Sequence, residues 1–217
     1  MPHLFRPYAD TVARTVLVAV LVGPFLVVGL GYWLSASEYE TDYTLTVDQP
    51  VPFSHEHHVG GLGLDCRYCH TAVETSPVAS LPPTHTCMTC HSQLYTQTAM
   101  LAPVRESLAD NKPIHWNKVN RLPAYVYFDH SIHVAKGVGC TTCHGPVGTM
   151  PLMRQAAPLT MGWCLDCHRD PAPNLRPASE VFNPDWQPPS DHDAQAVVQA
   201  HLELDNKHLT DCSVCHR

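Results

Sequence analysis

The chain contains five copies of the pattern Cys-x-x-Cys-His, and these copies account for all 10 of its cysteines. Motifs 1 to 5, in chain order, occupy residues 66–70, 87–91, 140–144, 164–168 and 212–216. The two thiols of such a motif can form thioethers with the vinyl groups of one haem, and its histidine can bind the iron. The sequence therefore predicts five covalently bound haem c groups. The predicted thioether cysteines are Cys66, Cys69, Cys87, Cys90, Cys140, Cys143, Cys164, Cys167, Cys212 and Cys215. The predicted proximal iron ligands are His70, His91, His144, His168 and His216.

Other uses of paired cysteines do not explain the histidine that follows each pair. A disulfide framework has no need of it. Zinc ribbons usually share two cysteine pairs per metal, and five pairs cannot be divided in that way. Thioredoxin-like redox pairs occur singly, within a strand–helix–strand unit. Haem attachment is the reading that uses every residue of the motif.

A second repeat predicts the ligands on the opposite side of the irons. FSHEHHV at residues 53–59 precedes motif 1, and FDHSIHV at residues 128–134 precedes motif 3. Histidines three residues apart share one face of a helical turn, from which they can reach two adjacent irons. We therefore predict four distal ligands, two in each repeat: His55, His58, His130 and His133. Surface histidines without a role would have no reason to recur at matching positions of the two repeats.

The distal ligand of the fifth haem stays open. Methionine is a known axial ligand and raises the reduction potential relative to histidine, but a lone methionine more often fills a core. His201 precedes Cys212 by the same spacing that separates His55 from Cys66. The candidates are Met150, Met153, His201 and His208.

Composition predicts short helices and loops with little β structure. The chain has 20 prolines among 217 residues, and proline interrupts helices and sheet ladders. Only 15% of its residues are charged, and its formal net charge is −7. An acidic balance argues against nucleic acid as a partner. We expect a mostly α-helical and irregular multihaem cytochrome c domain whose interior is largely porphyrin.

One membrane anchor is predicted at the N-terminus. Residues 15–34 carry no charge, and about 20 apolar residues suffice to cross a bilayer. Arg6 and Arg14 flank the first end, which predicts a cytoplasmic N-terminus and an extracytoplasmic haem domain. A cleaved signal peptide, with residues 35–37 as its cleavage site, is the alternative, but the apolar stretch is longer than a usual signal core.

The repeats divide the chain into four parts. Residues 1–37 form the N-terminus and anchor, residues 38–121 the first dihaem module with a connecting helix, residues 122–170 the second dihaem module, and residues 171–217 a proline-rich arm, a helix and the fifth haem. Leu94, Leu101, Val104 and Leu108 predict the connecting helix by their spacing. Residues 124–128 are expected to be extended, and residues 190–208 helical.

The anchor and the sequences FSHEHHVGGLGLDCRYCH, LPPTHTCMTCH, YVYFDHSIHVAKGVGCTTCHGPVGTM, LTMGWCLDCHR and LTDCSVCHR together resemble the ActA family. These are the membrane-anchored pentahaem cytochrome c subunits of alternative complex III, and the resemblance covers residues 10–217. It implies a subunit of the bacterial cytoplasmic membrane that relays electrons from quinol oxidation to a periplasmic carrier or terminal oxidase. It also implies a polytopic quinol-oxidising subunit, an iron–sulfur subunit and a monohaem cytochrome as partners, and it favours Met150 as the ligand of a His/Met haem.

Two alternatives remain. A small membrane-anchored multihaem quinol dehydrogenase feeding a periplasmic reductase would also have one anchor and several haems. A multihaem reductase of nitrite or hydroxylamine would need an open iron position, whereas all five motifs end in histidine and the candidates suffice to close every iron.

Overall fold

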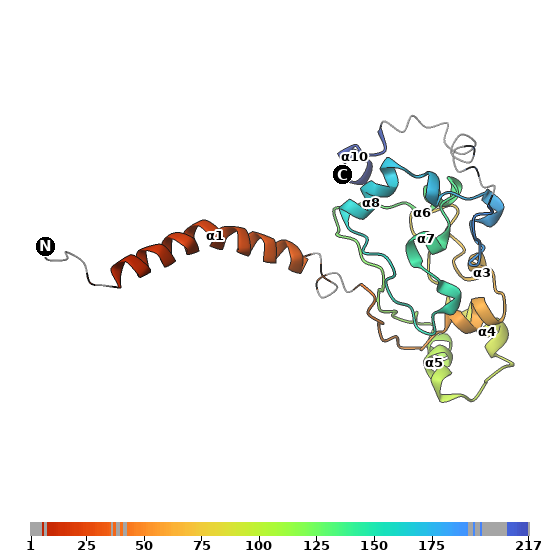
Figure 1. Cartoon of the computed structure of the whole chain (residues 1–217). Helices are drawn as coiled ribbons and strands as arrows, with labels where there is room; N and C mark the ends of the chain where they lie inside the picture. Colours follow the sequence, from red (N-terminus) through yellow and green to blue (C-terminus); the bar gives the residue numbers. More distant parts are fainter. Residues whose placement is uncertain are drawn as a thin grey trace, which may run out of the picture. The chain divides into compact units, whose positions relative to one another are not determined.

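The computed structural model describes residues 6, 8–35, 37, 40, 43–190, 193, 196 and 208–216. The chain divides into two compact units, an N-terminal unit, Met1–Tyr43, and a C-terminal unit, Thr44–Arg217. One long apolar helix lies in the N-terminal unit, and short helices joined by irregular segments make up the C-terminal unit (Figure 1). The predicted fold class, mostly helical and irregular with one N-terminal apolar helix, is confirmed.

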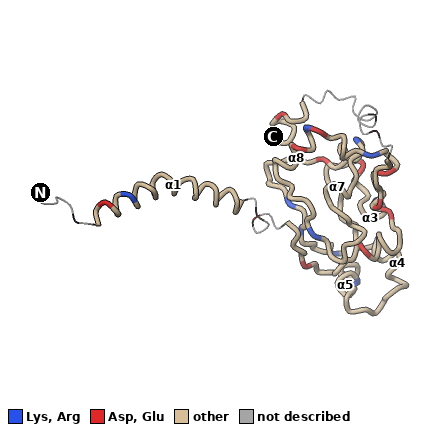
Figure 2. Tube along the Cα trace, viewed as in Figure 1, with Lys and Arg blue, Asp and Glu red and all other residues tan. Residues whose placement is uncertain are grey.

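Helix α1 (Ala9–Ser35) has the length and composition of a membrane span. Its most apolar 18-residue window has a mean hydropathy of 2.2, and none of that window is buried. A helix of 27 residues is about 40 Å long, more than the hydrocarbon core requires. Asp10 and Arg14, 2.9 Å apart, carry its only charges, and the rest of the helix is uncharged (Figure 2).

The C-terminal unit is built from short helices because prolines, glycines and haem motifs interrupt the chain every few residues. Its helices are the π-helix η1 (Glu56–Gly61), the 3₁₀ helices η2 (Ala99–Leu101), η3 (Val147–Thr149), η4 (Ala172–Asn174) and η5 (Ala178–Glu180), and the α-helices α3 (Cys66–Cys69), α4 (Thr84–His91), α5 (Ala102–Asp110), α6 (His130–Ala135), α7 (Cys140–His144), α8 (Met161–Arg169) and α10 (Cys212–Cys215). Within the described residues, β structure is limited to isolated bridges.

Each Cys-x-x-Cys pair lies on one of these short helices, namely α3, α4, α7, α8 and α10. A helical turn brings residues three apart onto one face, so both thiols of a motif can reach the same haem. Side-chain caps start two of the helices: Asp65 accepts a hydrogen bond from the backbone N–H of Arg67 at 2.8 Å, and Thr160 accepts one from Trp163 at 3.4 Å.

The connecting elements largely follow expectation. The predicted connecting helix is η2 followed by α5, which ends at Asp110 with Asn111 in the left-handed conformation (φ 50°). Val126 forms an antiparallel bridge with His216, but Ala124 and Tyr125 lie in a turn, so the 124–128 segment is extended only in part. The proline-rich arm wraps the unit and buries Leu175 and Val181. The helix predicted at 190–208 lies almost entirely outside the described residues.

The apolar core of protein side chains is small. Among the described residues the buried apolar side chains are Val51, Val73, Val104, Met150, Ala157, Ala172, Leu175 and Val181. Protein interiors are densely packed, and this set is too small to hold a unit of this size together. The remaining apolar interior is what five porphyrins would supply.

A close backbone approach joins the first distal-histidine segment to the segment after motif 3. A Cβ atom at Gly60, in η1, would lie 2.2 Å from the carbonyl oxygen of Gly148, in η3. Glu56 also donates its backbone N–H to the Met150 carbonyl at 3.0 Å. Only glycine at position 60 allows η1 and η3 to pack together in this way.

We expect Gly60→Ala to lower the free energy of unfolding of the mature protein by about 1–3 kcal/mol, because the added methyl group meets backbone that cannot rotate away. Chemical denaturation followed by haem absorbance measures this loss. Gly162→Ala is the matched control, since a Cβ there meets nothing within 4 Å. Equal stability of the two variants would contradict the prediction.

Candidate functional site

The structure places each of the four predicted distal histidines opposite a histidine of a motif. The four pairs and the distances between their ring centroids are His55 with His70 (6.5 Å), His58 with His91 (6.2 Å), His130 with His144 (6.3 Å) and His133 with His168 (6.1 Å). The first and third pairs have nearly parallel rings, with interplanar angles of 0° and 4°. The sequence predicted both sets of residues but not which member of one set faces which member of the other.

These separations fit one iron between each pair of rings. A metal bound by two imidazole nitrogens at about 2 Å holds the ring centroids about 6 Å apart. Four different pairs, formed by residues from different parts of the chain, share this spacing. The residues present therefore fit a six-coordinate haem at motifs 1 to 4. Iron binding by them stays a prediction.

Hydrogen bonds fix which ring nitrogen points at the partner. A carbonyl accepts a hydrogen bond only from a protonated nitrogen, so Nδ1–H donates and Nε2 is left as the metal-binding atom. The carbonyl partners of the Nδ1 atoms are Ser54 for His58, Ser80 for His70, Leu94 for His91, Pro77 for His130, Asp129 for His133, Leu209 for His168 and Tyr125 for His216, at 2.6–3.3 Å.

Burial keeps several of these rings neutral. It lowers the pKa of His55 and of His144 to about 4 in each case, and neighbouring histidines add to the fall. Burial also lowers the pKa of His58 and of His133. A neutral imidazole is the form that binds a metal, so at neutral pH no proton has to leave these rings before an iron is bound.

The two distal pairs have nearly the same surroundings, as the sequence repeat predicts. Phe53 stacks on His58 at 4.3 Å between ring centroids, and Phe128 stacks on His133 at 4.4 Å. The backbone differs: the first pair is on the π-helix η1, the second on the α-helix α6. The first repeat has one more residue between its histidines and its cysteines. A π-helix accommodates one inserted residue and so keeps both histidines in place.

His144 is held differently from the other motif histidines. Its Nδ1 lies 3.0 Å from the side-chain amide of Asn120, and the Asn120 Oδ1 atom is buried without a partner. Rotating this amide by half a turn lets Oδ1 accept the Nδ1–H of His144 and satisfies both groups. Sequence reasoning missed Asn120, because nothing in its local pattern sets it apart.

Contacts between the motifs define a spatial order. The Cys66 and Cys140 thiols interact by a hydrogen bond, which lowers the pKa of Cys66 and raises that of Cys140, so motifs 1 and 3 are adjacent. Burial, together with the Cys87 thiol of motif 2, raises the pKa of Cys69. Burial, together with the motif 4 thiols, raises the pKa of Cys143 to about 11. Burial, together with Cys215 of motif 5, raises the pKa of Cys164. The motifs therefore neighbour one another in the order 2, 1, 3, 4, 5.

The four histidine pairs account for motifs 1 to 4, which leaves His216 of motif 5. Met150, one of the most buried side chains, lies beside motif 3: its methyl carbon is 3.3 Å from a Cβ built at Gly145. That position favours a packing role, and Met150 as a ligand stays a prediction. Nδ1 of His208 is 3.0 Å from an Asp211 carboxylate oxygen. His201 lies outside the described residues.

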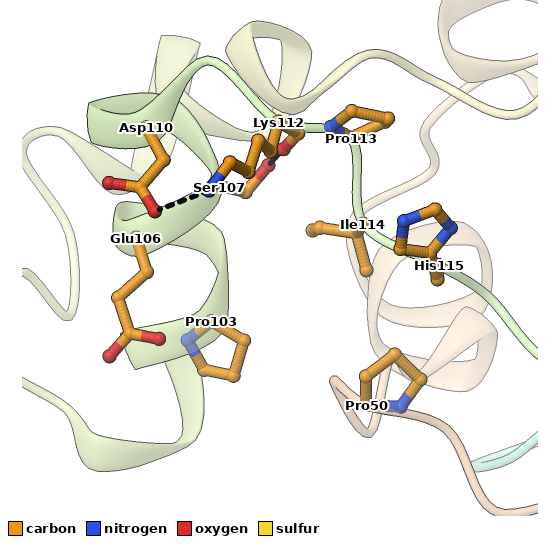
Figure 3. Close-up of a pocket in the computed structure, with 9 residues that line it drawn as sticks. All are labelled: Pro50, Pro103, Glu106, Ser107, Asp110, Lys112, Pro113, Ile114 and His115. Carbon is orange, nitrogen blue, oxygen red and sulfur yellow. Dashed lines mark hydrogen bonds and ion pairs between the residues drawn. The ribbon is translucent and has the colours of Figure 1, made fainter.

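An open groove of about 360 Å³ lies between α5 and the segment that follows it (Figure 3). Glu106, Asp110 and His115 line it together with several prolines. The groove contains no motif cysteine and no predicted ligand, so it is not part of the haem-binding site.

Comparison with known proteins supports this reading of the site. Residues 126–217 match a family described as "Cytochrome c7 and related cytochrome c". The chain is also 35% identical over 98 residues to the "Menaquinone reductase, multiheme cytochrome c subunit" of Nitratidesulfovibrio vulgaris. That match covers 45% of this chain and 46% of the relative, so the chain spans about half of the relative's length. Residues 126–217, in the C-terminal unit, are thus similar to cytochrome c proteins, a family whose members bind covalent haem c.

Replacing His130 with Ala should convert the haem of motif 3 from low spin to high spin, because His144 would lose the ring facing it. Electron paramagnetic resonance of the oxidised full-length protein measures the change. His133→Ala should act in the same way at motif 4. His115→Ala, which alters an exposed groove residue, is the control and should leave every haem low spin. An unchanged low-spin spectrum in His130→Ala with full haem content would refute the pairing.

Proposed function

We propose that this protein is a membrane-anchored pentahaem cytochrome c that relays electrons from a quinol-oxidising membrane complex to an extracytoplasmic acceptor. The observation that carries the proposal is the set of four facing histidine pairs, all at the spacing of one iron, beside four of five haem motifs. Saturating each iron with two protein ligands favours electron transfer over substrate chemistry at the metal.

Each motif would bind one haem c, which supplies a reversible one-electron centre. The ten cysteines would attach the five groups, and the facing histidines would supply both protein ligands of the iron at motifs 1 to 4, so that electron transfer would need no ligand exchange there. Phe53 and Phe128 fix the ring planes of His58 and His133 by stacking. The carbonyl partners of Nδ1 fix the ring orientation further and make the imidazoles better donors.

The spatial order of the motifs gives the relay two ends. Motifs 2 and 5 are terminal, and Cys90 and Cys212 are the exposed cysteines of the set. We infer that electrons enter at one of these ends and leave at the other. Motifs 1 and 3 lie in the middle of this order. The contact between Cys66 and Cys140 would therefore connect the two dihaem modules.

The surroundings of the relay are also proposed. Helix α1 would be a single-pass anchor with a cytoplasmic N-terminus, which places the C-terminal unit outside the cytoplasm. The resemblance to the ActA family supports alternative complex III as the host complex. Its quinol-oxidising and iron–sulfur subunits would donate electrons, and a monohaem cytochrome or a terminal oxidase would accept them.

A second host complex is favoured by the similarity to the menaquinone reductase subunit. In a complex of that kind the same relay would carry electrons toward a quinone instead of away from a quinol. Both proposals use the same haem-binding residues and differ in the direction of net transfer and in the partner subunits.

Purification of the intact complex from membranes, using a tag on this chain, separates the two proposals. Identification of the copurifying subunits is followed by two assays: reduction of the haems by a quinol, and reduction of a quinone by the pre-reduced complex. Haem reduction by quinol beside an iron–sulfur subunit supports the first proposal. Quinone reduction as the faster direction supports the second. A chain purified without partners that reduces nitrite or hydroxylamine would overturn both.

The intact mass of the mature chain should exceed that of the polypeptide by five haems, because every cysteine belongs to a complete motif. Replacing Cys215 with Ala should weaken attachment at motif 5 without changing the other four sites. Mass spectrometry under denaturing conditions measures both. An excess of four haems or fewer in fully mature wild-type protein contradicts the assignment of five sites.

If Met150 binds the fifth iron, oxidised wild-type protein has the near-infrared absorption band of a methionine–iron bond, and one haem has a potential well above the rest. Met150→His should abolish the band and lower that potential. Loss of the band in Met153→Leu instead identifies Met153. A wild-type protein that lacks the band excludes both methionines and leaves His201 and His208.

A further inference from the structure

A buried arginine lies against motif 3, and no carboxylate of the described residues forms an ion pair with it within 4.0 Å. Arg176 is 5% exposed, in the proline-rich arm. Its backbone N–H donates to the Gly137 carbonyl at 2.9 Å, and its Nη2 donates to the Thr141 hydroxyl at 3.0 Å. A Cβ atom at Gly139 would lie only 2.0 Å from the centre of the guanidinium group. The guanidinium therefore packs directly on the backbone that leads into Cys140.

The other hydrogen-bond acceptors and the ring contact of Arg176 are neutral, and the Glu180 carboxylate attracts the guanidinium from beyond ion-pair distance. Nη1 donates to the backbone carbonyls of Glu180, at 3.4 Å, and Asn183, at 3.2 Å, and the guanidinium lies over the Trp186 ring at 4.7 Å. Nε is buried without a hydrogen-bond partner. Among the described residues Arg176 forms no ion pair within 4.0 Å.

Such an arrangement is costly, because desolvation outweighs the attraction of the Glu180 carboxylate and lowers the pKa of Arg176. A well-packed apolar side chain would avoid this cost. That cost is offset if the positive charge stabilises one state of a nearby group, such as the reduced state of a redox centre.

Two motifs lie near the guanidinium. Thr141, which accepts its hydrogen bond, belongs to motif 3. The Cys66 sulfur of motif 1 lies 3.8 Å from the Phe182 carbonyl, next to the Asn183 carbonyl that Arg176 binds.

We propose that Arg176 raises the reduction potential of the central pair of haems, that of motif 3 first and that of motif 1 second. This inference rests on haem attachment at these two motifs, as proposed above. Reduction adds one electron to a ferric haem, supplied by the donor complex, and lowers its net charge by one without making or breaking a bond. A nearby positive charge therefore stabilises the ferrous state.

Arg176 is a positioning and electrostatic residue rather than an iron ligand. Its fixed hydrogen bonds hold the charge in place, and burial protects it from screening by salt. A unit charge about 10 Å away, acting through an effective dielectric constant of about 20, changes an equilibrium roughly tenfold. The charge lies near motifs 1 and 3, between the terminal motifs 2 and 5. By raising the reduction potentials of the haems at motifs 1 and 3, it would keep them as easily reduced as the terminal haems.

Spectroelectrochemical titration of the full-length, haem-loaded protein tests the inference. Arg176→Gln should lower the ferrous-to-ferric ratio of one or two haems roughly tenfold at a fixed potential. Arg176→Lys keeps the positive charge and should retain most of the wild-type ratio. The matched control is Arg67→Gln. Arg67 lies beside Cys66 but is about half exposed and paired with Asp65 at 2.7 Å, so its removal should change the potentials far less.

Unchanged potentials in Arg176→Gln, with five haems present by mass, overturn the inference and leave the proposed function standing. An equal shift in Arg67→Gln also overturns it, because the effect would then be one of net charge. If Arg176→Gln loses haem, Arg176→His decides. One midpoint should then fall as pH rises and the imidazole loses its proton, and a pH dependence identical to that of wild type rejects the inference. Absence of haem from motifs 1 and 3 in the wild type would count against the proposed function itself.

Discussion

Two imidazole rings held opposite each other, with room for one metal ion between their nitrogen atoms, are the constraint on which the C-terminal unit depends. Four pairs meet it within a few tenths of an ångström. Each pair joins residues that are distant in sequence, so the backbone between them has to follow whatever path the pair requires. This explains why the unit consists of single-turn helices and loops, and why so few apolar side chains are buried.

Local sequence predicted the parts of this arrangement that local geometry determines. The motif spacing predicts haem attachment, and the paired histidines of the two repeats are the rings that face His70, His91, His144 and His168. The proline content predicted that β structure in the described residues would be scarce, and it is limited to isolated bridges. Which ring faces which depends on contacts across the fold, such as Pro77 with His130, and these leave no trace in a short window of residues. For the same reason Asn120 and Arg176 were found only in the structure.

The two dihaem modules show how a repeat can diverge without losing its geometry. The extra residue in the first repeat is absorbed in η1, while Phe53 and Phe128 keep their stacking distances almost unchanged. The modules meet where Gly60 passes Gly148 and where Cys66 meets Cys140. One contact is between two glycines and the other is between two predicted haem-attachment cysteines. Both bring the backbones of the modules close together, so one module has little freedom to move against the other.

The single helical turn that carries two distal histidines has a consequence for assembly. His55 and His58 leave the ribosome together, but the ring that faces His58 belongs to motif 2 and follows well after motif 1. His168 likewise takes its carbonyl partner from Leu209, near the end of the chain. The pair at motif 1 needs only residues 55–80, whereas the pair at motif 2 needs both ends of the first module, and the pair at motif 4 needs a residue next to motif 5. A defect near motif 5 should therefore also free the ring of His168 in motif 4, whereas the pair at motif 1 would be unaffected.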